Sequence, residues 1–260
     1  MDAYEPFDRR MRRLRRERAP RSGGDADYLL RRAADELLER LESVKREFRR
    51  ALVLGSGDPS LARRLREQGI EVVAADAGAG LGDVQCDEDR LPFGDGAFDL
   101  VVCQFGIMFF PDKVAGNREA RRVLRGGGRY LLVIWDEVAR NAGSQAISDA
   151  VAALFPDDPP RFIDRTPFGY ADPARIEHDL LAAGFTDIEF ETVEKRSRLP
   201  SARDAAIGMC MGSPLRSEIE ERDPAMLERA VEAATAALAR WEGPNGFDAP
   251  MSAHIVTATK

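Results

Sequence analysis

Short apolar runs that lack the alternation of a half-exposed strand recur along the chain. Residues 51–54 and 70–75 are two such runs, and we expect both to be strands buried on two faces of a sheet. Gly55-Ser56-Gly57 lies between them and predicts a tight turn. Asp58-Pro59 is a favourable helix start, and Gly69 is a favourable stop. The first third of the chain therefore predicts strand, glycine turn, helix and strand.

The same succession of strands and helices continues toward residue 260. We expect further strands at residues 83–86, 99–103, 130–135, 186–193 and 251–259. Helices are expected at residues 25–48, 112–124, 144–154, 172–184 and 223–241, with glycines 126–128 ending the second of these. Strands that alternate with helices indicate an α/β fold with a mostly parallel sheet.

The predicted elements divide the chain into two parts. Residues 1–48 form an N-terminal basic segment and a helix, and residues 49–260 form one larger domain. Cap elements are expected within residues 195–249. No internal repeat is visible.

Charge and composition exclude several classes of function. The net charge of −7 argues against general nucleic-acid binding, although residues 9–21 are densely basic. We interpret that segment as a solvated helix face or, alternatively, as a contact surface for a protein partner. No apolar run approaches the roughly 20 residues of a membrane span, so we expect a cytoplasmic protein without a membrane span.

Cysteine and histidine usage argues against a metal site. The three cysteines are widely spaced and form no Cys-x-x-Cys pair, which indicates a reducing compartment and neither disulfides nor zinc. His178 and His254 are the only histidines, and both are expected to be structural rather than catalytic.

The glycine turn suggests a binding site for a nucleotide-type cofactor. A strand whose turn leads into a helix N-terminus presents free backbone N–H groups, and an acid at the end of the next strand can bind ribose hydroxyls. Asp76 is in that place. Similar turns occur in α/β proteins that bind nothing there, so the motif alone leaves both interpretations open.

Several longer segments carry a family resemblance. LPFGDGAFDLVVCQFGIMFFPD at 91–112, REARRVLRGGGRYLLVIWDE at 118–137 and the segment at 180–193 resemble class I S-adenosylmethionine-dependent methyltransferases of type 11, the ubiquinone/menaquinone methyltransferase-like group. Residues 7–19 and 27–41 resemble instead the branch of malonyl-carrier-protein methyltransferases and complex I assembly factors. The resemblance implies a Rossmann-like sheet of seven strands with an antiparallel last strand.

The resemblance also implies residue roles. S-adenosylmethionine would be the cofactor, and a small or carrier-bound apolar molecule would accept its methyl group. The implied cofactor-binding residues are Gly55, Ser56 and Gly57 at the methionyl part, Asp76 at the ribose, Asp87 with the backbone around Glu88 at the adenine, and Gln104 and Phe105 facing the methyl group. Phe109, Phe110 and Trp135 would line an acceptor pocket, although aromatic residues at strand ends also occur as core. No catalytic residue is named, because alignment of an activated donor accounts for most of the rate.

Three positions depart from the family pattern. Val53 stands where an acid is usual, Pro59 stands where a third glycine is usual, and residues 77–82 are too few for a helical crossover. An alternative function is therefore a degenerate methyltransferase fold that acts as an assembly or scaffold protein. A different reaction, such as hydroxylation, is a third possibility, which the lack of metal-ligand histidines leaves without support.

Overall fold

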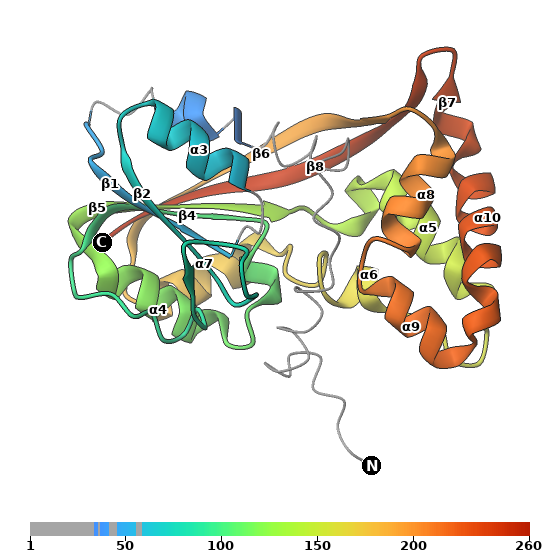
Figure 1. The fold of residues 1–260 in the computed structure, drawn as a ribbon, viewed down its shortest axis with the longest axis horizontal. Coiled ribbons are helices and arrows are strands. Elements are labelled where there is room, and N and C mark those ends of the chain that lie inside the picture. Colours follow the sequence, from blue (N-terminus) through green and yellow to red (C-terminus); the bar gives the residue numbers. More distant parts are fainter. Residues whose placement is uncertain (1–33, 36, 42–45, 56–58) are drawn as a thin grey trace.

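A computed structural model of the chain describes residues 34–35, 37–41, 46–55 and 59–260. In this part the strands form one sheet in the order β3-β2-β1-β4-β5-β8-β6, with β7 paired to β8 (Figure 1). Neighbouring strands of the ordered path are parallel except where β8 pairs with β5 and β6. The strands are β1 (Arg50–Leu54), β2 (Glu71–Asp76), β3 (Val84–Gln85), β4 (Phe98–Gln104), β5 (Leu124–Trp135), β6 (Thr186–Leu199), β7 (Glu242–Gly243) and β8 (Gly246–Thr259). The predicted mostly parallel sheet with an antiparallel last strand is confirmed.

Helices cover both faces of the sheet and build a separate cap. The α3 helix packs on one face, α4 and α7 pack on the other, and the remaining helices gather beyond the end of β5 (Figure 1). The helices are α3 (Pro59–Glu67), α4 (Lys113–Val123), α5 (Ala142–Ala152), α6 (Phe162–Arg165), α7 (Pro173–Ala182), α8 (Ala202–Cys210), α9 (Leu215–Arg222) and α10 (Leu227–Leu238).

Alternate residues of β1 point into different cores, as strand geometry requires. Leu52 and Leu54 pack with α4 and α7, whereas Ala51 and Val53 pack with α3. The described residues between 34 and 41 are helical, and their apolar side chains join the α3 core. Because both faces are covered, all seven residues of β4 are buried.

A third core holds the cap together. It contains side chains of α8, α9 and α10, which lie within the predicted cap range 195–249, and also side chains of α5 and α6. The cap is joined to the sheet by a long ribbon of β6 and β8, whose pairing extends as far as Leu199 opposite Phe247 (Figure 1).

Glycine ends α3 where the sequence predicted. Gly69 has φ +83°, a left-handed conformation that other residues rarely adopt. The N–H of Ile70 donates to the carbonyl of Leu65, and that of Gly69 donates to Arg66, which is the Schellman pattern. The chain therefore turns directly from α3 into β2.

Two predicted boundaries are wrong. The helix expected at 25–48 does not extend to its predicted end, because residues 46–49 are not helical. There the buried carboxylate of Asp99 accepts hydrogen bonds from the N–H groups of Arg49 and Arg50, which holds the chain extended as it enters β1. Glycines 126–128 lie within β5 rather than before it, where the pairing with β4 shifts register.

The predicted absence of a crossover helix between β2 and β3 is confirmed. Residues 77–83 contain only bends and turns, yet β2 and β3 pair in parallel. Asp83 supplies contacts at the place where a crossover helix would lie. Its carboxylate accepts hydrogen bonds from the N–H of Ala74 at 2.8 Å and from Arg66 of α3 at 2.6 Å. A side chain thus fixes the edge of β2 where a helix would otherwise cover it.

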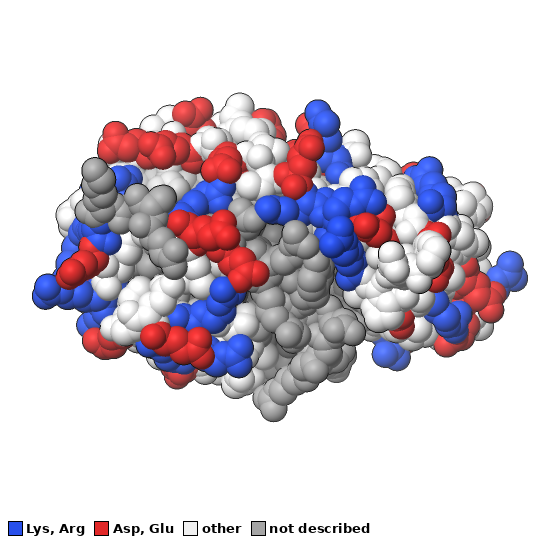
Figure 2. All heavy atoms as spheres, turned by 90° about the horizontal axis from the view of Figure 1, so that it is seen from above, with Lys and Arg blue, Asp and Glu red and all other residues white. Residues whose placement is uncertain are grey.

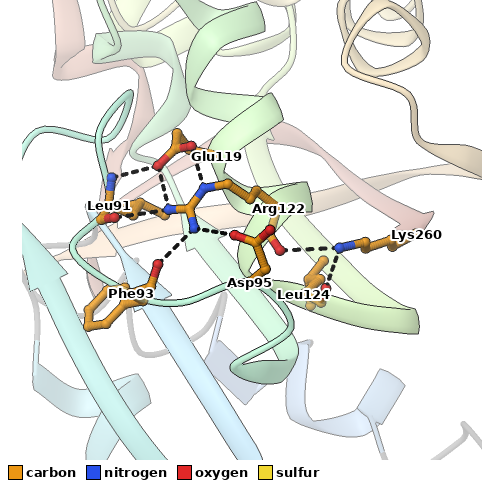
Figure 3. A network of polar contacts seen from close by, with 7 residues as sticks. All are labelled: Leu91, Phe93, Asp95, Glu119, Arg122, Leu124 and Lys260. Carbon is orange, nitrogen blue, oxygen red and sulfur yellow. Dashed lines mark hydrogen bonds and ion pairs between the residues drawn. The ribbon is translucent and has the colours of Figure 1, made fainter.

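Arg122 of α4 holds the loop that precedes β4 (Figure 3). Its guanidinium donates to the carboxylates of Glu119 and Asp95 and to the carbonyl oxygens of Leu91 and Phe93. The pKa of Glu119 lies below its ordinary value, mainly because Arg122 donates to its carboxylate and also because the N–H of Leu91 does. Two of the segments that carry the family resemblance, 91–112 and 118–137, are therefore parts of one network.

Charged side chains of both signs are interspersed on the face seen from above (Figure 2). The basic segment at residues 9–21 lies outside the described residues, so its predicted role as a solvated face or partner surface stays a prediction.

Candidate cofactor and acceptor site

Two glycines touch at the point where the strand order reverses. Gly55 follows β1 with φ +67°, and Gly106 follows β4, the neighbour of β1 on the other side from β2. A Cβ atom on Gly106 would lie 2.7 Å from the carbonyl oxygen of Gly55, so no side chain fits there. Crevices at such reversal points, outside the carboxyl ends of the strands, are where open α/β sheets bind ligands. Of the predicted glycine turn, Ser56 and Gly57 lie outside the described residues.

Buried carboxylates lie near this contact. Glu88 is 2% exposed, and its Oε1 would be 3.6 Å from a Cβ placed on Gly55. Asp76, at the end of β2, is 1% exposed and accepts a hydrogen bond from the N–H of Gly78 at 2.8 Å. Asp87 is half-buried. The carboxylates of Glu88 and Asp76 therefore supply negative charge at the carboxyl ends of the strands, in surroundings that screen it less than water does.

The three departures from the family pattern meet in one small pocket. Val53, Pro59 and residues 80–82 line it together with Asp76, and its volume is about 210 Å³. The pocket lies between α3 and β2, where the missing crossover helix leaves space. The structural consequence of the three departures is thus local to the side of Asp76 that faces α3.

An aromatic stack leads away from the glycine contact. Phe105 follows β4 with φ 50°, which is uncommon for a residue with a side chain. Its ring stacks on Trp135 with 4.1 Å between ring centroids and 17° between planes. Trp135 in turn lies 5.9 Å from the ring of Phe168. Gln104, the last residue of β4, is fully buried.

Trp135 also lines a larger pocket between the sheet and the cap. This pocket has a volume of about 550 Å³ and is bounded by α5, α8, α10 and the β6–β8 ribbon. Its apolar lining includes Ile147, Phe168, Met209, Leu238, Phe247 and Met251. Its size is within the range of small-molecule sites.

The other two predicted acceptor residues are placed differently. Phe110 is fully buried in the core, where it packs against Gly55 and Gly116. Phe109 is partly buried and packs against both the sheet core and the cap core. Neither lines the two pockets described above, so Trp135 is the predicted acceptor residue that the structure brings to a pocket.

Comparison with known proteins finds a matching family model for part of the chain. Residues 52–132 match the family model described as "Methyltransferase domain", of type 11. That range includes Gly55, Asp76, Glu88 and the stack residue Phe105. Residues 52–132 are therefore similar to type 11 methyltransferase domains.

Curated relatives of this methyltransferase domain have named activities. A ubiquinone/menaquinone biosynthesis C-methyltransferase of Stenotrophomonas maltophilia is 38% identical over 109 residues, 34% of this chain and 43% of that protein. A demethylmenaquinone methyltransferase of Mycolicibacterium vanbaalenii is 28% identical over 185 residues, 64% of this chain and 79% of that protein. The match to the first of these spans less than half of its length.

Solved methyltransferases share the fold. Phosphoethanolamine N-methyltransferase 2 of Haemonchus contortus, in complex with S-adenosylhomocysteine, has a TM-score of 0.51 at 15% identity. The likeness covers 88% of this chain and 52% of that one. At this identity it supports the fold of the methyltransferase domain alone.

Sequence reasoning missed a polar cluster beside Trp135 in the methyltransferase fold. Asp136 accepts from the hydroxyl of Ser252 at 2.7 Å and lies 3.2 Å from Nε2 of His254. The other ring nitrogen of His254 lies 3.0 Å from the hydroxyl of Thr192. This partly buried cluster connects the end of β5 to β8 and β6. His254 is buried within this cluster, whereas His178 is exposed.

Gly106 was also missed. The sequence signal that could have found it is a glycine directly after the fourth apolar run, where two strand ends must approach each other. In the part of the chain that the structure describes, no group of three His, Cys, Asp or Glu side chains could hold a metal ion. No helix among the described residues is long and apolar enough to cross a membrane.

Proposed function

We propose that this protein transfers a methyl group from S-adenosylmethionine to an apolar acceptor, either a small molecule or a carrier-bound group. The type 11 methyltransferase domain supports the reaction class. The curated relatives named above are quinone methyltransferases, which supports an apolar acceptor.

The residues at the strand ends fit the cofactor in charge and in space. S-adenosylmethionine carries a positive sulfonium and ammonium group, and the nearly fully buried carboxylates of Glu88 and Asp76 are complementary to positive charge and to ribose hydroxyls respectively. Gly55 and Gly106 leave backbone without side chains beside them. Glu88, by its contact with Gly55, is assigned here to the methionyl end rather than to the adenine.

Methyl transfer mainly requires that the acceptor atom is aligned with the methyl group of the cofactor. When bound, the cofactor supplies a methyl group whose bond to sulfur breaks with the electron pair left on sulfur, while the acceptor atom forms the new bond and releases its proton. Phe105 and Trp135 would hold the acceptor and exclude water from the reacting atoms, which contributes through proximity and desolvation.

The observation that carries this proposal is the stack of Phe105 on Trp135. Phe105 follows the strand whose end touches Gly55, and Trp135 lines the apolar pocket of about 550 Å³. One pair of rings thus connects the predicted methyl-donor site with a pocket of suitable size and polarity.

Thermal unfolding with and without 5 mM S-adenosylhomocysteine tests the donor site. A ligand at a hundred times its dissociation constant stabilises by ~2.7 kcal/mol, which raises the midpoint by roughly 5–10 °C in a chain of this size. The test variant is Asp76→Asn, which keeps the shape of the side chain. It should lose most of that shift. An equal shift in the variant would remove Asp76 from the site.

A second candidate is a scaffold protein with weak or no cofactor binding. It is favoured by the meeting of Val53, Pro59 and the short loop in one pocket beside Asp76. This candidate predicts no thermal shift with S-adenosylhomocysteine and a stable complex with a protein partner.

A further inference from the structure

The pocket between sheet and cap is elongated along the β6–β8 ribbon. Trp135 pairs with Ala253 on β8, and the pocket lining continues along β8 from Met251 to Phe247. Four residues of a strand span about 13 Å. The pocket therefore has one end at the aromatic stack and another end inside the cap.

Two charged side chains line the pocket, and each already has a polar partner. Its charged lining residues are Arg198 and Asp204. Arg198 lies 3.4 Å from the carboxylate of Asp248, and Asp204 accepts from the hydroxyl of Ser201 at 2.6 Å. Arg198 is therefore not a free counter-charge for an anion, and burying an anionic ligand group beside the apolar lining is unfavourable. The described walls thus favour an uncharged occupant.

One face of α8 lines the pocket, and two of its residues, Ala205 and Gly208, are small. Asp204, Ala205, Gly208 and Met209 face the pocket, whereas Ala202, Ala206 and Cys210 are buried in the cap core. A Cβ atom placed on Gly208 would meet nothing within 4 Å. Glycine within a helix lowers the stability of that helix, so the open space beside Gly208 comes with a loss of helix stability.

We propose that this pocket is the acceptor site, that it takes an elongated, uncharged, apolar molecule with its reacting end at Trp135, and that Gly208 limits the size of that molecule. The methylation of the occupant rests on the proposed function, whereas its binding does not. The class of ligand follows from the length of the pocket, the pairing of Arg198 with Asp248 and the apolar lining.

The test uses two fluorescent probes with the same ring skeleton. N-phenyl-1-naphthylamine is uncharged, and 8-anilino-1-naphthalenesulfonate carries a sulfonate. Fluorescence titration of the full chain should show saturable binding of the uncharged probe, at least tenfold tighter than that of the sulfonate. Equal or tighter binding of the sulfonate would overturn the uncharged class.

Variants of α8 locate the binding. Gly208→Phe should weaken binding of the uncharged probe at least tenfold, and Gly208→Ala should weaken it by a smaller factor. Ile207→Phe is the matched control, since Ile207 is exposed and does not line the pocket. Circular dichroism confirms that each variant is folded. Unchanged probe affinity in folded Gly208→Phe would overturn the proposal.

A parallel thermal shift with S-adenosylhomocysteine separates the two proposals. A retained shift in Gly208→Phe together with lost probe binding supports both. A shift without any probe binding in the wild type overturns the acceptor pocket alone. Probe binding that depends on residue 208, without any cofactor shift, supports the pocket and contradicts methyl transfer.

Discussion

Phe105 and Trp135 stack at 4.1 Å between ring centroids, one from the end of β4 and the other from the end of β5. Because Phe105 adjoins the predicted donor site and Trp135 lines the pocket, ligands at either place should perturb Trp135. In Trp241→Phe, which leaves Trp135 as the chain's remaining tryptophan, we expect its emission to change with S-adenosylhomocysteine and with an uncharged apolar probe. Emission that responds to neither ligand would show that the stack is not part of a ligand site.

Gly106→Ala should damage the donor site. The new Cβ would lie 2.7 Å from the carbonyl oxygen of Gly55 and 2.9 Å from the sulfur of Cys103, so backbone must move. Overpacking of this kind costs about 1–3 kcal/mol. Urea unfolding should report that loss, and the thermal shift with S-adenosylhomocysteine should disappear. The control Gly94→Ala adds a methyl group in open space and should change neither measurement.

Glu88→Gln should weaken binding of the cofactor without unfolding the protein. It removes a negative charge beside Gly55 and keeps the shape of the side chain. A hydrogen bond to a charged group contributes about 1.5–3 kcal/mol, so we expect roughly 10- to 100-fold weaker binding by calorimetry. Glu137→Gln, at a carboxylate outside both pockets, is a suitable control. Wild-type affinity in Glu88→Gln would remove Glu88 from the methionyl end.

Glu119→Gln should make stability less dependent on pH. The pKa of Glu119 is lowered in the folded protein by the hydrogen bond from Arg122, so the pair stabilises the fold above the unfolded pKa of about 4.3. This contribution is lost as the pH falls through the lowered folded pKa. The difference in unfolding free energy between wild type and variant should be about 1.5–3 kcal/mol at pH 7 and shrink toward pH 3. A difference that stays constant over this range would contradict the pairing.

Much of the sheet could be predicted because its strands are buried on both faces. The apolar run before Gly55 proved to be a strand buried over its last four residues, and the run before Asp76 proved to be its partly buried neighbour. The ribbon was underestimated for the converse reason. Residues 194–198 of β6 are polar and alternate between exposed and half-buried, so only their pairing with β8 defines them as a strand.

The site was less predictable, because its parts meet only in the fold. The contact of Gly106 with Gly55 joins residues about 50 positions apart, and no local pattern announces it. Phe110 resembles a pocket residue in sequence, yet the absence of a side chain at Gly116 lets it pack into the core. The acceptor pocket draws its lining from helices and strands between Trp135 and Met251, which a linear scan cannot assemble.

Isothermal titration of S-adenosylhomocysteine into the full chain tests the central proposal most directly. The account predicts saturable binding at one site per chain, with a dissociation constant between roughly 1 µM and 1 mM. Asp76→Asn should reduce that affinity strongly. No binding to the folded wild-type chain at millimolar concentration would contradict the methyltransferase proposal and leave the scaffold function as the account of this fold.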